Sequence, residues 1–390
     1  MRFNQFWGRS AGMFLSIPAI FLYQIVLLVS SISAAEEFMV TSLAEEPRRP
    51  FLGQGLPFYQ KLVMPVNIAV AGDLMLGSWI VEKVETEGVD SPYDSTRSLL
   101  LPADVAVANL EAPLADNGSL FVEKQYTFKV PTRFIEGIVN AGFDVLTLAN
   151  NHILDYGCGG LTQTLAAVKN AGIAWCGAGV NREAACAPVM LEVNGLVLAF
   201  VGFSMTYPDD FWATATRCGT CHPDEEMLFD IISACEMNAD LTIVNVHWGT
   251  EKKSAPNPYQ IEMAHRLIDL GADLVLGHHP HVLQGLELYR GKLIAYSMGN
   301  YIFGSISENA KTSMILQIAL DMNGLLSAKA LPIHVYNAVV KFQPKILRGD
   351  DKKAVLEELR VLSRPLNSGR DILDLEGNIL PATRFAQQIK

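Results

Sequence analysis

The chain has no run of lysine or arginine residues, and its acidic side chains outnumber its basic ones. In 390 residues, 30 Lys and Arg stand against 41 Asp and Glu, which gives a formal net charge of −11 at pH 7. Proteins that bind nucleic acids usually present a basic face to the phosphate backbone. We therefore expect no nucleic acid among the partners, and we attribute the acidity to solubility.

Cysteine is scarce, and internal repeats and low-complexity segments are absent. The six cysteines are Cys158, Cys176, Cys186, Cys218, Cys221 and Cys235. So few cysteines exclude the class of small scaffolds in which disulfides replace a hydrophobic core. The length is instead sufficient for a large core, in one large domain or two smaller ones.

The N-terminal segment carries no charge over residues 10–35, which follow Arg2 and Arg9. Small residues at positions 33–35 offer a site for signal peptidase, and no cysteine nearby indicates a lipoprotein. The uncharged stretch also reaches the roughly 20 residues that span a bilayer. Residues 1–35 are therefore predicted to be either a signal peptide or an N-terminal membrane anchor. Both interpretations place the remainder outside the cytoplasm, in the periplasm or at the cell surface.

Three further regions follow this segment. Residues 36–64 contain charges and prolines and are predicted to be a linker. Residues 65–340 alternate strand-like and helix-like segments and are predicted to form the main domain. Residues 341–390 are more polar, and we expect them to be a C-terminal extension that packs on this domain.

Hairpins and βαβ units both occur in the predicted order of elements. The strongest hairpin signal is Asn194-Gly195 between two apolar runs, and helical segments precede the runs at residues 241–246 and 273–276. This mixture excludes a wholly parallel sheet. It predicts an α/β fold with two packed mixed β-sheets flanked by helices.

Five of the eight histidines lie in three short blocks, each directly after an apolar run that is predicted to be a buried strand. The blocks are Asn150-Asn151-His152, His247-Trp248-Gly249 and Gly277-His278-His279-Pro280-His281. Ligands of α/β sheets gather at the carboxyl ends of the strands, so the three blocks can converge. Neutral imidazoles bind Mn, Fe or Zn, and amide or carboxylate oxygens complete such sites. The pattern therefore predicts a metal site.

Carboxylates follow two other predicted strands. Asp73 ends the first strand, where it could ligate a metal or simply cap a turn. Glu111 ends the next one, and strand alternation places it on the same side as Asn109. Asp155 follows the block Asn150-Asn151-His152 and could orient His152, which could then protonate a leaving group.

The remaining histidines differ in their expected roles. His279 and His281 stand two residues apart in a turn stiffened by proline, which favours ligation of a metal by both. His278 is set aside, because three imidazoles so close in sequence cannot all face one ion. His265 lies in a helical pattern and His334 in a strand, and both are interpreted as structural.

The order of these blocks resembles the calcineurin-like metallophosphoesterases and, more closely, the CapA-type capsule synthesis family associated with poly-γ-glutamate capsules. The resemblance covers residues 67–303 and rests on the following segments: Gly72-Asp73, Val107-Ala108-Asn109-Leu110-Glu111, Leu148-Ala149-Asn150-Asn151-His152, His247-Trp248-Gly249-Thr250-Glu251, Gly277-His278-His279-Pro280-His281-Val282-Leu283-Gln284 and Tyr296-Ser297-Met298-Gly299-Asn300-Tyr301-Ile302-Phe303. It implies an αββα sandwich. It also implies a divalent metal bound by Asp73, Asn151, His247, His279 and His281, with His152 as the acid.

Two positions depart from the active phosphoesterases. Where those enzymes have a histidine two residues after the first aspartate, this chain has Met75, a poor ligand for a hard cation. Where they have a bridging aspartate, only Asn109 or Glu111 is present, and we include Glu111 among the ligands. A two-metal site needs a shared ligand between ions about 3.5–4 Å apart. We therefore expect one or two ions.

A C-x-x-C-H motif is formed by Cys218, Cys221 and His222. Outside the cytoplasm this motif is the attachment signature of c-type haem. Here it lies in a loop within the region of resemblance, without the helical segment that would cover a haem. We expect no haem, and we expect instead a local disulfide or free thiols.

Three functions are compatible with these features. The first is a capsule or poly-γ-glutamate biosynthesis protein whose metal site hydrolyses a phosphoester or a γ-glutamyl amide. The second is a non-catalytic scaffold that handles an anionic polymer, and the third is a secreted phosphatase similar to nucleotidases. The first two imply an anionic polymer such as poly-γ-glutamate as a partner, together with membrane-embedded capsule synthesis subunits.

Overall fold

The computed structural model describes residues 63–379. The predictions for residues 1–35, for most of the linker and for the end of the C-terminal extension lie outside the described residues. Within the described range, no helix has the length and apolar character needed to cross a bilayer.

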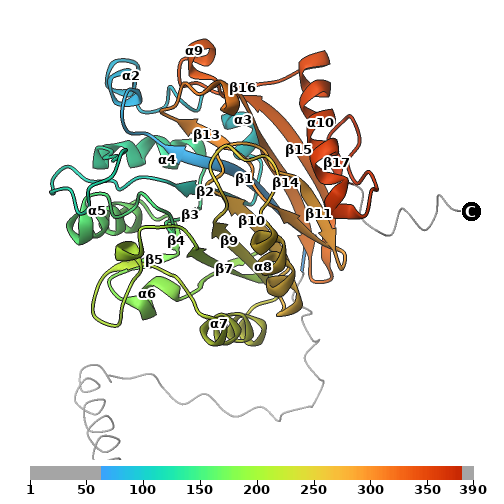
Figure 1. Cartoon of the computed structure of the whole chain (residues 1–390), viewed down its shortest axis with the longest axis horizontal. Helices are drawn as coiled ribbons and strands as arrows, with labels where there is room; N and C mark the ends of the chain where they lie inside the picture. Colours follow the sequence, from blue (N-terminus) through green and yellow to red (C-terminus); the bar gives the residue numbers. More distant parts are fainter. Residues whose placement is uncertain (1–62, 380–390) are drawn as a thin grey trace, which may run out of the picture. The chain divides into compact units, whose positions relative to one another are not determined.

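The first sheet contains nine of the described strands, with β1 at its centre (Figure 1). They are β1 (Val66–Met75), β2 (Val105–Leu110), β3 (Val145–Thr147), β4 (Ala174–Cys176), β13 (Asn300–Phe303), β14 (Thr312–Asp321), β15 (Gly324–His334), β16 (Lys345–Ile346) and β17 (Asn378–Ile379). Strand β1 pairs in parallel with β2 and β13 and antiparallel with β14. The sheet is therefore mixed, as predicted.

The second sheet contains six of the described strands in the order β11-β12-β10-β9-β7-β6. They are β6 (Val189–Val193), β7 (Leu196–Ser204), β9 (Leu241–His247), β10 (Leu274–His278), β11 (Leu286–Tyr289) and β12 (Lys292–Ala295). The predicted hairpin joins β6 and β7, with Asn194 and Gly195 both at positive φ as a tight hairpin turn requires. A small third sheet pairs β5 (Ala178–Gly179) with β8 (Gly219–Thr220).

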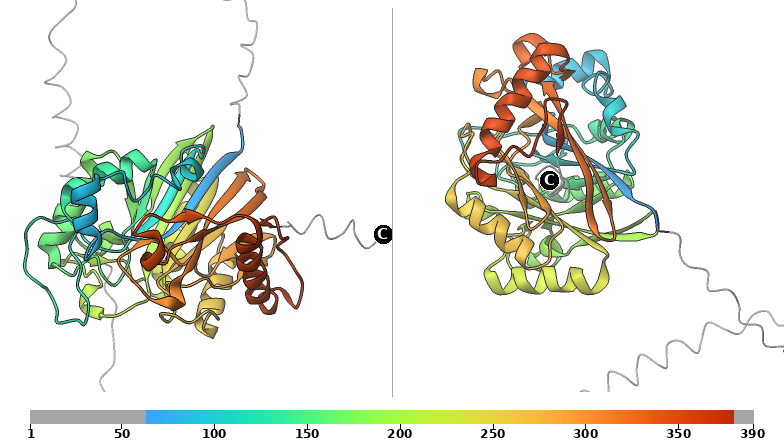
Figure 2. Two further views of the ribbon diagram at one scale, coloured as in Figure 1. Left: turned by 90° about the horizontal axis from the view of Figure 1, so that it is seen from above. Right: turned by 90° about the vertical axis from the view of Figure 1, so that its right-hand side faces the viewer.

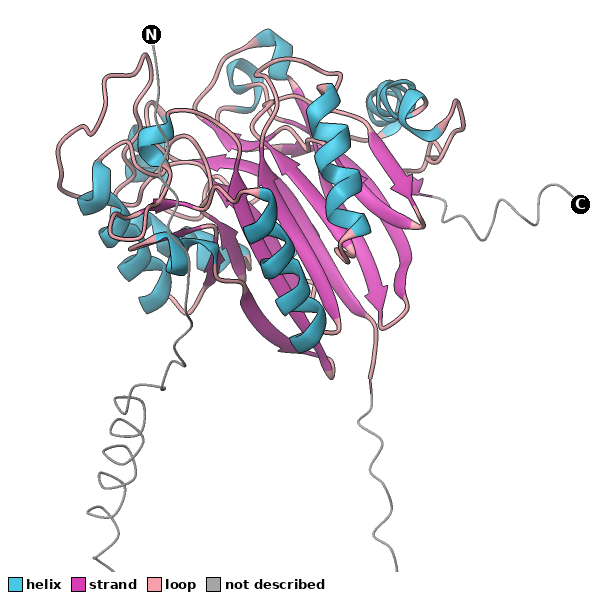
Figure 3. Ribbon diagram, turned by 60° about the horizontal axis from the view of Figure 1, so that its bottom comes forward, coloured by secondary structure: helices cyan, strands magenta, loops and turns pink. Residues whose placement is uncertain are grey.

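Helices cover the outer faces of the two large sheets. The described helices are α2 (Ile80–Glu87), α3 (Arg97–Leu100), α4 (Ile135–Ala141), α5 (Gly157–Asn170), α6 (Arg182–Cys186), α7 (Glu225–Asn238), α8 (Pro258–Asp269), α9 (Asn337–Val340) and α10 (Gly349–Ser363). Helices α4 and α5 lie on the side of the first sheet, whereas α7 and α8 lie along the second sheet (Figures 1 and 3). The predicted two-sheet sandwich flanked by helices is thus confirmed.

Alternating side chains of β1 explain how the sandwich is held together. Ile68 and Val70 point into the core between the two sheets, whereas Ala69 and Ala71 point into the core under the helices of the first sheet. The views in Figure 2 show the strands enclosed between helices. Because both faces of the central strands are covered, they read in sequence as continuous apolar runs.

The C-terminal part of the described chain closes one end of the space between the sheets. Helix α10 contributes Val355, Leu356 and Leu359 to the same apolar core as Ile68 and Val70. It lies beside β15 and β17, at the end opposite α5 (Figure 1). Residues 341–379 therefore belong to the folded unit.

An irregularity near the end of β1 brings Asp73 into position. The pairing register with β2 shifts between Val70 and Asp73, and Gly72 lies there against the turn before β13. A Cβ atom at Gly72 would lie only 1.8 Å from the carbonyl oxygen of Gly299, so only glycine fits. The backbone N–H of Asp73 donates to the same oxygen, at 3.0 Å. The close approach fixes the carboxylate at the edge shared by β1 and β13.

Candidate metal centre

The predicted ligands lie at the carboxyl ends of strands from both large sheets. Asp73 lies near the end of β1, Glu111 follows β2, Asn151 follows β3, His247 ends β9, and His279 and His281 follow β10. Parallel strands place all these ends at one edge of the sandwich. The structure therefore brings the three histidine blocks and both carboxylates together.

Glu111 lies at the centre of this group. Its Oε1 atom is 3.7 Å from His247 Nε2 and 3.6 Å from His281 Nε2. Glu111 shares one potential metal-binding set with His247 and His279 and a second with Asp73 and His281, and the ligand atoms within each set lie within 4.8 Å of one another. Two overlapping sets with a common carboxylate can hold one divalent cation, or two that share Glu111.

Asn109 orients the carboxylates and is not placed as a ligand. Its side-chain amide donates to Asp73 Oδ1 at 2.9 Å and to Glu111 Oε2 at 3.1 Å. Its own oxygen accepts from the side-chain amide of Asn150, at 3.1 Å. Both ends of the Asn109 side chain are thus occupied, which leaves Glu111 as the oxygen ligand that β2 supplies. Asn151 completes the group, with Oδ1 2.9 Å from His247 Nε2.

The electrostatics of the site suit a cation. Burial and the neighbouring charge of His279 hold the pKa of His247 well below its usual value, and burial and His281 lower the pKa of His279 to about 3. Both imidazoles are therefore neutral, as metal ligands must be. Burial and Asp73 raise the pKa of Glu111 well above its usual value, and its Oε1 has no hydrogen-bond partner among the described residues. A positive ion would satisfy that oxygen and stabilise the carboxylate.

The turn after β10 holds its histidines in an unusual backbone conformation. His279 has φ +98° and His281 has φ +59°, in the region that favours glycine, and Pro280 lies between them. Such conformations destabilise the fold locally and persist at sites where the surrounding structure dictates them. His281 is further fixed because its Nδ1 lies 2.9 Å from Asn300 Oδ1 and 3.2 Å from Asp73 Oδ2. Its Nε2 is thereby directed towards Glu111.

His152 forms a second group at the edge of the ligands. Its Nδ1 lies 2.8 Å from Asp155 Oδ2, and the Asp155 carboxylate also accepts from the backbone N–H of Phe128 at 2.7 Å. The ammonium of Lys124 donates to Asp155 Oδ1 at 2.8 Å and to the backbone oxygen of Asn151. Burial lowers the pKa of His152, and the hydrogen bond to Asp155 opposes that effect. The geometry allows Asp155 to orient His152; the catalytic role of the pair remains a prediction.

Met75 and His278 behave differently from the other residues of the site. The sulfur of Met75 accepts a hydrogen bond from the backbone N–H of Gly77, at 3.1 Å. His278 is in the site although it was set aside, because its Nδ1 lies 3.1 Å from Asp73 Oδ1. Together with His281, it holds the pKa of Asp73 well below its usual value despite burial.

Three of these contacts were not predicted from the sequence. Lys124 comes from a loop without periodicity, and nothing in its neighbours indicated that it reaches His152. Asn300 lies in one of the segments that carry the family resemblance, but no role at the site was predicted for it. Its position directly after Gly299 could have indicated a residue at a strand edge. Glu251 also lies in one of those segments and was not predicted to be at the site. A carboxylate oxygen of Glu251 lies within 4.8 Å of ligand atoms of His279 and His281.

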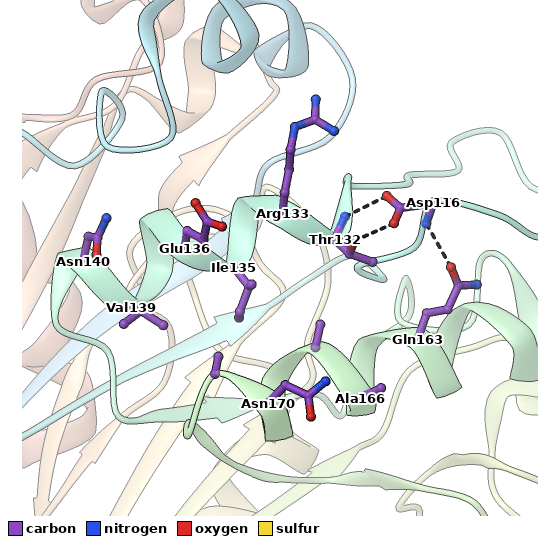
Figure 4. Close-up of a pocket in the computed structure, with 12 residues that line it drawn as sticks. Asp116, Thr132, Arg133, Ile135, Glu136, Val139, Asn140, Gln163, Ala166 and Asn170 are labelled. Carbon is purple, nitrogen blue, oxygen red and sulfur yellow. Dashed lines mark hydrogen bonds between the residues drawn. The ribbon is translucent and has the colours of Figure 1, made fainter.

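Two cavities differ in what they offer. One of about 480 Å³ is lined by His152 and His281 and therefore opens directly on the site. Another of about 770 Å³ lies between α4 and α5, away from the histidines (Figure 4). In that cavity, the Asp116 carboxylate accepts hydrogen bonds from Thr132, and the Asp116 backbone N–H donates to Gln163. The polar groups of Asp116 therefore already have partners within the protein. We place the chemistry at the first cavity.

The C-x-x-C-H cysteines form disulfides with distant partners. Cys218 is bonded to Cys158 and Cys221 to Cys186. The expectation of a local disulfide or free thiols was therefore wrong, because the pairing joins the loop to α5 and α6. No thiol of the motif is left to bind haem. His222 stacks on Trp212 with ring centroids 3.7 Å apart, and its Nδ1 lies 2.8 Å from the backbone oxygen of Ser204, which indicates a structural role.

Comparisons with known proteins agree with this arrangement. The model of a family described as "Bacterial capsule synthesis protein PGA_cap" matches residues 67–305. The capsule biosynthesis protein CapA of Bacillus anthracis is 32% identical over 301 residues, which are 75% of this chain and 72% of that protein. The PGA biosynthesis protein CapA of Bacillus subtilis is 29% identical over 298 residues, 75% of this chain and 77% of that protein.

Among solved structures, the NAD nucleotidase of Haemophilus influenzae aligns with 76% of this chain and 63% of its own, with 12% identity and a TM-score of 0.44. That likeness concerns the fold alone.

Proposed function

This chain belongs to the family of bacterial capsule synthesis proteins, and we propose that it is a metal-dependent hydrolase that acts during production of the capsule polymer. The observation that carries the proposal is the convergence of two neutral histidines and the buried Glu111 carboxylate beside the His152–Asp155 pair. We propose a phosphoester or a γ-glutamyl amide as the bond that is cleaved, and one or two ions of Mn, Fe or Zn.

The residues present fit a divalent cation, and each has a distinct task. Glu111, His247 and His279 would hold the ion with Asn151, and Asp73 and His281 would complete a second position. A bound ion polarises the substrate and lowers the pKa of a water molecule. The carboxylates of Asp73 and Glu111 are fixed beforehand by Asn109, so little reorganisation is needed when the substrate binds.

His152 would transfer a proton to the leaving group. Its Nδ1 faces Asp155, so its Nε2 is the nitrogen available to the substrate. General acid catalysis of this kind contributes about 10²–10⁴-fold to a rate. Lys124 neutralises the buried charge of Asp155 while it holds the turn that carries Asn151.

Replacement of His152 by Ala tests the proposal, because His152 is not one of the metal ligands. We expect the variant to fold and keep the metal content of the parent, and to lose hydrolysis of phosphoesters or γ-glutamyl amides by at least about 10²-fold. Retained capsule production by this variant in cells would instead favour a structural role.

That structural role is the second candidate, and one observation favours it. Met75 stands where the active phosphoesterases have a histidine ligand, and its sulfur accepts a hydrogen bond from the backbone N–H of Gly77. A scaffold that binds an anionic polymer such as poly-γ-glutamate through its metal would need no complete second position. Absence of hydrolysis in the metal-loaded parent, together with binding of the polymer, would support this candidate.

We also propose that the protein works outside the cytoplasm, together with membrane-embedded subunits of the capsule machinery. The two disulfides support this location, since such bonds persist in oxidising compartments and are rare in the cytosol. Mapping of the disulfides in protein taken from the native cell envelope tests it. Reduced Cys158 and Cys186 in that material would contradict it.

A further inference from the structure

The cavity beside His152 and His281 has a wall that includes aromatic and aliphatic side chains, unlike the polar side chains of the metal centre. It lies among four loops that carry Trp79, Tyr126, Lys252 and Ile306. Its volume of about 480 Å³ is within the range of small-molecule sites, and it opens onto His152, His281 and Asn300. The cavity therefore adjoins the metal centre.

The inner wall is aromatic and touches the histidines directly. The ring centroid of Phe128 is 4.5 Å from that of His152, and that of Phe303 is 4.6 Å from that of His281. Phe128 and Phe303 meet edge to face at 6.2 Å. The two histidines that line the cavity are therefore bordered by an apolar surface.

The outer rim continues the same surface. Trp79 is 60% exposed, Tyr126 62% and Ile306 52%, and the three come from three separate loops around one opening. Large apolar side chains left open to water around a single cavity mark a place where an apolar group binds. The charged side chains that line the cavity are Glu251 and Lys252, one of each sign. A stretch of polyanion would need more than one cation along its path.

From these contacts we propose that the cavity is a leaving-group subsite for a group with an apolar body, such as a ring or an alkyl chain. The inference rests on the proposed hydrolase function. In the reaction, one water molecule adds its oxygen to the phosphorus or carbonyl carbon, and the bond to the leaving oxygen or nitrogen breaks. His152 gives that atom its proton and is restored by the proton that the water loses. The departing apolar body extends from the rings of Phe128 and Phe303 to Trp79 and Tyr126 at the rim.

Two matched pairs of probes test the subsite in the metal-loaded full chain. Binding of phenylphosphonate is compared with binding of methylphosphonate by calorimetry, and hydrolysis of γ-glutamyl benzylamide is compared with that of γ-glutamyl methylamide, since both release an alkylamine. The charge is the same within each pair, so any preference reports on the apolar body. We expect the aryl member to be favoured in at least one pair by about tenfold.

The double variant Trp79→Ala/Tyr126→Ala should abolish that preference and leave the methyl compounds unchanged. Phe229→Ala is the matched control, because Phe229 is 53% exposed on α7, outside the residues that line this cavity. Absence of an aryl preference in both pairs, or its survival in the double variant, would overturn the proposal. If the aryl compounds bind in a way that depends on Trp79 but no compound is hydrolysed, the subsite would be supported and the proposed hydrolase function would be contradicted.

Discussion

The Nδ1 atom of His152 lies 2.8 Å from Oδ2 of Asp155, and both side chains are buried. We expect Asp155→Asn to lower the rate of hydrolysis by at least about tenfold, because the carboxylate accepts from Nδ1 and stabilises the imidazolium that donates from Nε2, which a neutral amide does not do. The metal content should not change, since Asp155 belongs to none of the ligand sets. Steady-state kinetics and metal analysis of the same preparation check both statements.

The same substitution should also lower stability, for a separate reason. Lys124 has 16% of its side chain exposed and loses its carboxylate partner, which destabilises the fold by up to about 3 kcal/mol. The double variant Lys124→Met/Asp155→Asn removes both charges and should recover part of that stability without recovering the rate. Recovery of both together would mean that Asp155 acts only through folding.

Glu111→Gln should change stability in opposite directions with and without metal. Burial and Asp73 raise the pKa of Glu111 above its unfolded value of about 4.3. The metal-free fold therefore binds more protons than the unfolded chain, and its stability falls as pH rises from about 4.3 through the raised pKa. Glutamine does not titrate, so the metal-free variant should melt above the parent at pH 8.

With metal, the order should reverse. Substitution of a residue that only orients a metal ligand typically lowers metal affinity by about 10–100-fold. Loss of the Glu111 carboxylate itself should lower the affinity at least as much. Thermal melting at pH 8, with chelator and with excess Mn²⁺, gives both comparisons. A variant that is less stable than the parent in both conditions would show that Glu111 has a structural role alone.

The location of the site could be predicted from the sequence because its ligands follow strands. His247 comes directly after the six residues 241–246, a mainly apolar run that indicates a strand end without any knowledge of the fold. Lys124 could not be predicted, because it lies in a loop, and only the folded chain brings it to a residue 28 positions away. The partner of Cys218 was missed for the same reason, since the bond spans 60 residues and pairing does not follow from spacing.

His279→Gln should show the opposite pH trend to Glu111→Gln in metal-free protein. Burial and His281 lower the folded pKa of His279 to about 3, below its unfolded value of about 6.5. The folded state then binds fewer protons than the unfolded chain, so the contribution of His279 is present above about pH 6.5 and is lost as pH falls towards 3. The variant should thus gain stability relative to the parent as the solution is acidified.

Urea unfolding at pH 7.5, 6 and 5 measures that difference, with about 1.4 kcal/mol per pH unit as its upper limit for one group. His265→Gln is the control, since His265 lies on α8 away from the site and forms a hydrogen bond with Glu287. The same His279→Gln preparation should retain less metal than the parent after dialysis. Equal metal content in the two would remove His279 from the ligand set.

The disulfide between Cys158 and Cys218 should matter for catalysis as well as for stability. Cys158 stands three residues after Asp155, at the start of α5, so the bond fixes the segment that carries the His152–Asp155 pair. The loop that it anchors also carries Phe211, whose ring lies 5.0 Å from the Lys124 ammonium. Replacing both cysteines by serine should lower stability by about 4 kcal/mol, given the 60 residues that the bond encloses.

The bond between Cys186 and Cys221 is a matched control. It encloses 35 residues, so the chain-entropy effect of its removal on stability is similar, again about 4 kcal/mol. It joins α6 to the same loop, and Cys186 and Cys221 pack in the core under the second sheet's helices. We therefore expect both double variants to melt at lower temperature, and the loss of Cys158 and Cys218 alone to reduce the rate measured well below either melting point. Equal rates in the two variants would show that the first bond has no influence on His152 and that the pair is positioned by Lys124 and the backbone of Phe128 alone.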